Sequence, residues 1–597
     1  MQPKKLENQL TVLTSQLIGE KNNNSFWTGR LASSALSTAV ALVVFKLEKD
    51  NTNEKRIALG LKWLHDNVNE DGGFGDTPDC ISNVSSSLLC YAALRYCRTP
   101  EIDNTSLLEG IESFLADQGI SFTTEHLTSS VLKYYGKDFT FSVPILSMLA
   151  LCEVLTDDVY QNIPQLPFEF TLLPASLYRF FNLQVVSYAI PALVAVGIFI
   201  FKKRKRHNLL TKYYKNKCIS PAMKKLAAML PESGGFLEAI PLTGFVTMCL
   251  IASGMQDNVV VEKGIKFLKE QQRADGSWPI DTDLSTWVTT LSIKALGERL
   301  HNSLPEKDVD LLRSHLLNIQ YKERHSFNGA LPGGWGWTNY SGSVPDADDT
   351  PGAIIALLEM YKGTPDETLA IIKGCNWLIQ LQNSDGGIPS FCRGWGRLLF
   401  DCSCSDLSGH TLLAFLRTLD TLGNKIDSKT RRRIQYHAYK IIRYLGHHQS
   451  AEGCWIPLWF GNQLTEDKKN PVYGTAKVLT YFEDCLSLDS IQSLFRENLE
   501  QMASLAGNYL LTQQNKDGSW GGSLGVKGTI EETALSICAL TKRDRIACQK
   551  GFQWLEEEYT TNGLHASPIG LYFATLWYDE KMYPLIYYIE ALRRYLK

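Results

Sequence analysis

The chain has 597 residues, of which 44 % are hydrophobic and 21 % charged, so it is long enough for several globular domains. Its formal net charge of -3 argues against a nucleic-acid partner. The 14 Cys lack metal-type pairing and the start, MQPKKLENQL, has no apolar signal-peptide core, so a reduced, cytoplasmic setting is expected.

A short pattern begins near residue 58 and recurs along the chain: an aromatic–Leu pair, three residues, Gln, three residues, Gly, one residue and Trp. Strong copies cover residues 263–278, 440–455 and 506–520, and weaker copies cover residues 58–74, 373–388 and 550–565. Apolar residues before each Gln recur at helical spacing, the Gly closes the helix, and a second apolar helix follows. Such units predict a stacked or toroidal all-α architecture. The Gln amide is expected to bond loop backbone or a neighbouring helix end, which is a structural role.

Residues 185–201 carry no charge, and a basic run at residues 202–206 follows at once. A spanning helix needs roughly 20 apolar residues, so a spanning helix, a buried core helix and a segment dipping into one leaflet all compete. The basic run favours the third hypothesis, because each Lys or Arg near anionic lipid contributes about 1 kcal/mol. The residues expected at the membrane are Val185, Ile190, Leu193, Ile198, Phe199, Lys202, Lys203 and Arg204.

The stretch PDADDT, residues 345–350, places Asp346, Asp348 and Asp349 within four positions. One interpretation is a helix N-terminus, where the dipole stabilises carboxylates ahead of the apolar run at residues 352–360. A second is an acid: two carboxylates that stay ionised or hydrogen-bonded can keep a third protonated, and the cluster then titrates as a unit. One group can serve both roles.

The repeats beside GGWGWTNYSGSVPDADDTPGA resemble the squalene–hopene cyclase family, the class II triterpene cyclases. Residues 166–189 resemble its Pro-rich lead into a membrane-dipping helix, residues 404–416 its Asp-x-x-x-His helix, and residues 472–479 its Tyr-Gly-Thr turn. The resemblance implies two α/α barrels. Residues 1–30 with 284–597 are then expected to form the catalytic barrel. Residues 31–283 form an inserted second barrel, with a membrane-associating segment near 185–206.

The resemblance also implies a reaction, the protonation of an alkene in a linear isoprenoid such as squalene, followed by ring closure. By resemblance Asp348 is the proton donor and Asp346 and Asp349 support it. His410 pairs with the donor as an imidazolium, and Tyr473 belongs to the reprotonation side. No metal or organic cofactor is implied. The family further implies a monotopic protein at the cytoplasmic face of a membrane, often as a homodimer.

Cations need a lining that does not react with them, and aromatic faces attract positive charge. The aromatic residues expected in the substrate cavity are Trp287, Trp335, Trp337, Tyr340 and Tyr572. The chain departs from the family in part, because Val288 stands where an Asp is usual and Trp337 where Phe is usual. Substrate length and ring number are left open by these changes.

Three other hypotheses compete. A class II diterpene cyclase would act on a prenyl diphosphate and would need basic residues at the cavity mouth. A scaffold that binds polyprenyl lipids without turnover would have no need of the intact acids. A zinc site is the third hypothesis. Its ligands would be Cys392, Cys402, Cys404 and His410, although their spacing is not that of a usual zinc site.

Overall fold

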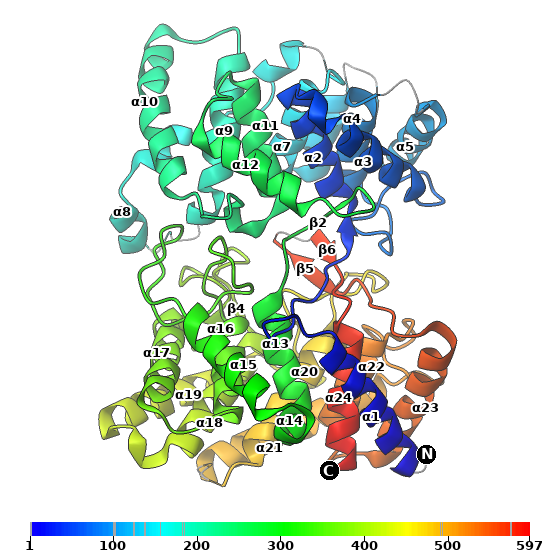
Figure 1. The fold of residues 1–597 in the computed structure, drawn as a ribbon, viewed down its shortest axis with the longest axis vertical. Helices are drawn as coiled ribbons and strands as arrows, with labels where there is room; N and C mark the ends of the chain where they lie inside the picture. Colours follow the sequence, from blue (N-terminus) through cyan, green and yellow to red (C-terminus); the bar gives the residue numbers. More distant parts are fainter. Residues whose placement is uncertain are drawn as a thin grey trace.

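The computed structural model describes residues 3–98, 103–122, 126–136, 139–155, 157–181, 183, 186–489, 491, 493–573 and 576–597. Helices dominate, and the all-α prediction is confirmed. The described strands form three short antiparallel pairs: β1 (Ser33–Ser34) with β2 (Trp278–Pro279), β3 (Ile388–Pro389) with β4 (Ser403–Cys404), and β5 (Gly570–Tyr572) with β6 (Leu576–Tyr578). The helices form two groups, one above the other in Figure 1, with both chain ends at the bottom.

The lower group is a barrel with an inner ring of helices. Each inner helix contacts the next, and the last contacts the first, which closes the ring. Its members are α13 (Ser285–Leu296), α16 (Asp349–Glu359), α18 (Ser405–Leu422), α20 (Pro471–Leu486), α22 (Ile530–Leu540) and α24 (Tyr583–Leu596). Neighbours cover these helices on most sides, and all residues of α22 are buried. That surrounding explains why most residues of these helices are buried.

Amphipathic helices form the outer layer of the lower barrel, and α1 packs along α24 beside them. Each buries one stripe; α15, for example, buries Val309, Leu312 and Leu316 at helical spacing. The outer helices are α1 (Pro3–Gly19), α15 (Glu306–Ile319), α17 (Pro365–Leu381), α19 (Ser428–His448), α21 (Ser493–Thr512) and α23 (Arg545–Asn562), with the short α14 (Leu300–Ser303) before α15. The N-terminal helix thus belongs to the same barrel as the C-terminal one.

The upper barrel repeats this design with a different ring. Its inner helices are α2 (Ala35–Glu48), α4 (Val84–Tyr96), α7 (Phe139–Leu151), α9 (Val186–Lys203) and α11 (Ile240–Ala252), and α11 contacts α2 to close the ring. Around them lie α3 (Glu54–Asp66), α5 (Thr105–Asp117), α6 (Leu127–Tyr135), α8 (Ala175–Phe180), α10 (Leu209–Ala228) and α12 (Val259–Gln271). The chain enters this barrel beside β1 and leaves beside β2, and Ser33 and Ser34 pair with Pro279 and Trp278.

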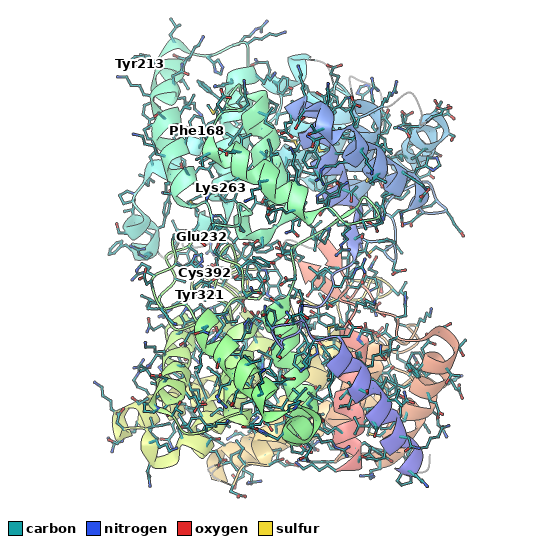
Figure 2. All side chains as sticks on the ribbon, in the orientation of Figure 1. Phe168, Tyr213, Glu232, Lys263, Tyr321 and Cys392 are labelled. Atoms are coloured by element: carbon teal, nitrogen blue, oxygen red, sulfur yellow. The ribbon has the colours of Figure 1, made fainter. Side chains whose placement is uncertain are left out.

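Short 3₁₀ turns connect several of these helices. They are η1 (Asn51–Asn53), η2 (Asp157–Gln161), η3 (Phe168–Leu172), η4 (Phe236–Glu238), η5 (Gly297–Arg299) and η6 (Gly423–Lys425). Of these, η3 packs against both α9 and α10 on the outside of the upper barrel. Figure 2 shows Phe168 of η3 within the upper barrel and Tyr213 at the outer side of α10.

The Gln residues of the repeats hold neighbouring outer helices together. Gln449 Nε2 donates to the carbonyl oxygens of Gly453 and Met502, each at 2.9 Å, and Met502 lies on α21. The same two-way bonding occurs at Gln272, Gln320, Gln382 and Gln514. Gly453 has a φ of +99°, and a Cβ there would stand 2.5 Å from the Leu505 carbonyl oxygen, so only Gly fits.

The strong copies of the repeat end with a Trp that ties an outer helix to a neighbouring inner helix. The Trp520 indole N–H donates to the Leu510 carbonyl at 2.8 Å, and its backbone N–H donates to the Thr533 hydroxyl at 3.0 Å. Trp335 makes the same two bonds, to the Leu316 carbonyl and the Thr350 hydroxyl, and is fully buried. This placement corrects the prediction that Trp335 lines the substrate cavity. A longer loop after Gln320 disguised this copy of the repeat.

Helix α9 is an inner helix of the upper barrel rather than a surface anchor. It is the one described helix long and apolar enough to cross a membrane, yet 61 % of its 18-residue window is buried inside the protein. Ile190, Ile198 and Phe199 are buried in the core, which contradicts their prediction as membrane-contacting residues, and Leu193 is half-buried. An inner barrel helix is as apolar as a membrane helix, because neighbours cover most of it. Val185 lies outside the described residues.

Two side chains of the basic run after α9 hold neighbouring loops. Lys202 Nζ donates to the Ser253 carbonyl at 2.8 Å. The Arg204 guanidinium donates to the carbonyls of Tyr160 and Ile163. Lys203 is exposed. Part of the run therefore stabilises the edge of the upper barrel.

Candidate active site

A cavity of about 90 Å³ lies at the N-terminal ends of the inner helices of the lower barrel. It faces the upper barrel, and Cys392, beside the cavity residue Phe391, lies between the two barrels in Figure 2. The lining residues are Leu284, Trp287, Trp337, Asp346, Asp348, Asp349, Phe391, Trp459, Phe460, Leu571, Tyr572, Phe573 and Tyr578. The wall is thus mostly aromatic and aliphatic, with one group of carboxyls.

The three carboxyls stand at the start of α16. One oxygen of Asp346 accepts the backbone N–H groups of Asp348 at 2.9 Å and Asp349 at 2.7 Å, so Asp346 satisfies donors that a helix start leaves free. The predicted helix N-terminus and the predicted acid cluster therefore coincide. Within the described residues, the other oxygen of Asp346 and one oxygen of Asp349 are buried, and their one hydrogen-bond partner is each other's carboxyl.

Burial raises the pKa of all three carboxyls above the usual range of Asp. For Asp348, the nearby charges of Asp346 and Asp406 raise the pKa further, whereas Lys477 lowers it. Because Asp348 lines the cavity, it holds a proton beside an apolar space at a pH where a solvated Asp is ionised. That arrangement suits a Brønsted acid.

His410 lies on α18 and is buried, with its ring stacked on Tyr481 at a centroid distance of 4.8 Å and edge-on to Trp287 at 6.1 Å. Burial, followed by the charges of Lys477 and Lys294, lowers its pKa well below the usual value. The imidazole is therefore neutral. A neutral ring differs from the imidazolium that the resemblance implies for His410.

Lys477 is the buried cation of this site, and sequence reasoning missed it. It lies on α20, one helical turn after Tyr473, and is 4 % exposed. Its ammonium faces four rings at 5.4 to 6.0 Å from their centroids: Trp287, Tyr473, Tyr481 and Tyr587. The available signal was a lone lysine inside the apolar run VYGTAKVL.

Tyr473 is fully buried beneath the cavity wall. Its ring stacks on Phe460 at 4.1 Å and 15°, and Phe460 lines the cavity. Among the described residues, the Tyr473 hydroxyl has no hydrogen-bond partner apart from the Tyr587 side chain. The Tyr473 backbone N–H donates to the side chain of Asn470, the N-cap of α20, at 2.9 Å. The ring is thus one layer away from the reacting space.

The predicted aromatic residues separate into two groups. Trp287, Trp337 and Tyr572 line the cavity. Tyr340 is 43 % exposed on the loop before the acid cluster, which corrects its prediction as a cavity residue. Asp281 fixes two of the wall residues, because its carboxyl accepts the Trp337 indole N–H at 3.1 Å and the Tyr572 hydroxyl.

Several cavity residues escaped the sequence analysis: Phe391, Trp459, Phe460, Phe573 and Tyr578. A signal existed for some of them. Trp337, Phe391 and Trp459 follow the last residue of a repeat by two to four positions, where the loop turns towards the next inner helix. An aromatic residue at that position faces the cavity at three points of the ring.

The zinc hypothesis finds no support in the described residues, which contain no group of three or more His, Cys, Asp or Glu side chains that could hold a metal ion. Cys404 instead donates through its thiol to Asp406 at 2.7 Å. Burial raises the pKa of this thiol well above its usual value, so it stays protonated. A protonated thiol is a poor metal ligand.

Two known protein domains match parts of the chain. Residues 284–596 match the squalene-hopene cyclase C-terminal domain, and residues 6–166 match the prenyltransferase alpha-alpha toroid domain. The chain is 23 % identical to enfumafungin synthase of Hormonema carpetanum, over 94 % of this chain and 46 % of that protein. It is 23 % identical to the squalene hopane cyclase of Aspergillus fumigatus, over 84 % of this chain and 76 % of that protein.

A third relative, sporulenol synthase of Bacillus subtilis, is 26 % identical over 43 % of this chain and 40 % of that protein. The chain thus spans less than half the length of enfumafungin synthase and of sporulenol synthase. Among solved structures, ent-copalyl diphosphate synthase from Streptomyces platensis has the same fold, with a TM-score of 0.57 and 15 % identity over 99 % of both chains. Because the first match covers more than half of the sequence and contains the acid cluster and the cavity, the chain belongs to the squalene–hopene cyclase family.

Proposed function

We propose that this protein is a class II terpene cyclase that protonates a linear isoprenoid alkene, and that its substrate is squalene. The reaction takes place in the barrel that residues 1–30 and 284–597 form. The Asp348 O–H bond breaks and its proton adds to a terminal C=C bond. The remaining double bonds then close rings onto the cation, and loss of a proton or capture of water ends the sequence.

The observation that carries this proposal is a protonated carboxyl at the wall of an apolar, aromatic cavity. Burial and two neighbouring carboxyls keep the proton on Asp348 by raising its pKa. The faces of Trp287, Trp337 and Phe391 lie on the same cavity, where their quadrupoles stabilise a passing carbocation. A solvated acid could not reach a hydrocarbon held there.

The lining favours a hydrocarbon over a prenyl diphosphate. Within the part of the chain that the structure describes, no Lys or Arg lines the cavity. A diphosphate carries several negative charges and needs cationic partners near its binding site. Asp346, Asp348 and Asp349 at the wall repel such a group. Class II cyclisation of a prenyl diphosphate is therefore the second candidate.

Aromatic rings occupy much of the space that a substrate needs. Binding pockets for organic ligands measure about 300 to 1,000 Å³, well above the cavity volume here. Phe391 stacks on Phe573 at 5.7 Å, and Phe400 stacks on Tyr188 of α9 at 4.9 Å. The Phe391 and Phe400 rings, 5.5 Å apart, join these pairs into one cluster. Substrate entry requires this cluster to open.

We further propose that the protein docks on the cytoplasmic face of a membrane, through an apolar surface beside this cluster. The surface lies on η3, on α8 and on the loop after β3. Its exposed residues are Phe170, Leu172, Leu173, Leu177, Phe180, Phe181, Trp395, Leu398 and Leu399. Phe180 is 80 % exposed and Trp395 58 %. Apolar exposure gathered on these segments is costly in water and typical of membrane-contacting surfaces.

The activity is tested by incubating the protein with squalene, shorter and longer polyprenes, and geranylgeranyl diphosphate, with products identified by mass spectrometry. We expect cyclised hydrocarbon or alcohol from a polyprene, and none from Asp348→Asn. Asp310→Asn, which changes a half-buried Asp on α15 outside the cavity lining, is the matched control and should keep full activity. Unchanged product from Asp348→Asn would refute the role of the acid.

Membrane docking has a separate test. The double variant Leu177→Glu/Phe180→Glu should lose binding to anionic vesicles, and charge reversal at Lys202 to Arg206 should weaken it. Leu505→Glu, on the exposed face of α21 in the other barrel, should leave binding unchanged. Equal binding by all three variants would exclude this surface as the contact.

A further inference from the structure

We propose that Lys477 is the fixed positive charge that balances the carboxylate left on Asp348 after proton transfer. The inference deepens the proposed function and rests on it. Lys477 is a positioning residue in this scheme, because its ammonium acts on Asp348 through space and touches no reacting atom.

The ammonium is buried and held by rings alone. Trp287, Tyr481 and Tyr587 lie at 5.4 to 5.5 Å from Nζ, and Tyr473 lies at 6.0 Å. In the part of the chain that the structure describes, no hydrogen bond or ion pair of Lys477 is found. Ring faces offset part of the cost of burying a cation but leave its charge uncompensated.

The charged or titratable groups that act on Lys477 divide into two sets. The first set is Asp348 at the start of α16 with Asp406 and His410 on α18. The second set is Lys294 on α13 and Glu590 on α24, besides the tyrosines of α20 and α24. The carboxyls of the first set attract the ammonium, and the neutral His410 adds no charge.

The second set is already neutralised within itself. Lys294 Nζ lies 3.0 Å from Glu590, and Glu590 also pairs with Arg594 at 2.8 Å. Arg594 in turn forms a two-pronged pair with Asp484 at 2.6 and 2.7 Å. Among the described residues of this barrel core, Lys477 is therefore the cation that contacts no carboxylate.

Trp287 connects this charge to the reacting space. Its ring faces Lys477 on one side, and the same residue lines the cavity together with Asp348. When Asp348 gives its proton to the alkene, a carboxylate is left in a dry site, where an unbalanced charge is costly. The Lys477 field lowers that cost and so strengthens the acid. When the reaction ends, a proton returns to Asp348 and the site is reset.

The test compares Lys477→Met and Lys477→Arg with the parent protein. Met has a similar shape and no charge, whereas Arg restores the charge. We expect Lys477→Met to lower kcat at least tenfold with KM changed less than threefold, and Lys477→Arg to recover part of the loss. Lys294→Met removes a lysine over the same Tyr481 ring whose charge is paired, and it should keep kcat within threefold of the parent.

A second readout does not depend on turnover. The carbonyl stretching band of protonated Asp348 is assigned by infrared difference spectroscopy as the band that Asp348→Asn removes. Loss of the neighbouring cation makes Asp348 a weaker acid, so in Lys477→Met this band should persist to higher pH than in the parent. The high-pH limb of the kcat profile should move in the same direction.

The outcomes separate the two proposals. If the parent protein cyclises no polyprene, the proposed function fails, and the infrared titration still tests the coupling of Lys477 to Asp348. If the parent cyclises but Lys477→Met keeps the parent kcat and the parent band, the role of Lys477 alone is refuted. A lower kcat in Lys477→Met with an unmoved band also refutes it, because the loss then comes from packing.

Discussion

The inner rings of the two barrels have the same architecture but bury different chemistry. In the described residues of α2, α4, α9 and α11, every buried side chain is uncharged. In the lower barrel, buried ionisable groups stand on α16, α18, α20, α22 and α24. Burying charge costs stability unless it is paired, so a ring that does so repeatedly is typical of a site under functional selection.

The largest expected effect is on the acid cluster. Asp346→Ala removes the carboxyl that caps α16 and supports Asp348, so we expect kcat to fall at least about 100-fold and the free energy of unfolding by about 1 kcal/mol. Asp346→Asn keeps an oxygen for the two backbone N–H groups and should restore the stability but not the rate. Kinetic assays and thermal unfolding check both. Full activity in Asp346→Ala would contradict the claim that the buried carboxyls of the lower barrel serve catalysis.

The next largest effect tests the apolar ring. Ile198 on α9 is fully buried, so Ile198→Ala should cost about 2 to 5 kcal/mol of unfolding free energy. If α9 were instead a lipid-contacting anchor, the change would weaken vesicle binding and leave unfolding of the detergent-free protein nearly unaltered. Denaturant unfolding together with vesicle sedimentation distinguishes the two cases.

Removing the Lys477 charge should raise the free energy of unfolding, whereas the substitutions above lower it. Burial lowers its pKa from 10.5 to about 8. The unfolded chain then binds more protons between these values, so the folded state is penalised fully below pH 8 and gains stability as pH rises from 8 to 10.5. Lys477→Met should therefore raise the unfolding free energy at pH 7 by on the order of 3 kcal/mol. A variant that is less stable than the parent would contradict a buried, unpaired ammonium.

The smallest effect concerns the shared scaffold. Gln449→Ala leaves two backbone carbonyls, of Gly453 and Met502, without a donor, and should cost about 1 to 3 kcal/mol. Product composition should not change, because Gln449 is not among the residues that line the cavity. Thermal unfolding and product analysis of the same sample provide the measurement. An altered product pattern would show that the scaffold shapes the cavity.

Sequence pattern was sufficient for features that depend on local spacing. The repeats, the helical architecture and the Asp cluster at the start of α16 all follow from residues close together in the chain. Trp335 was misjudged because an inserted loop separates it from Gln320, which hides the repeat. Whether α9 faces lipid or protein depends on which helices surround it, and residue composition is the same in both cases.

The charge states of His410 and Lys477 could not be predicted for a related reason. A histidine on an apolar helix is neutral or charged according to the field at its position, and that field comes from α13 and α20, far away in sequence. In the sequence, Lys477 is indistinguishable from an ordinary helix lysine. Its burial depends on the other inner helices of the barrel. Electrostatics of this kind is a tertiary property.

The pairing of β1 with β2 brings residues 34 and 278 side by side, although 243 residues lie between them. A segment whose two ends meet can be lifted out of its host without stretching the host chain. The upper barrel is therefore an exchangeable inserted domain. Replacing residues 35–277 with the corresponding domain of a relative would change the barrel above the cavity while the acid cluster stays in place.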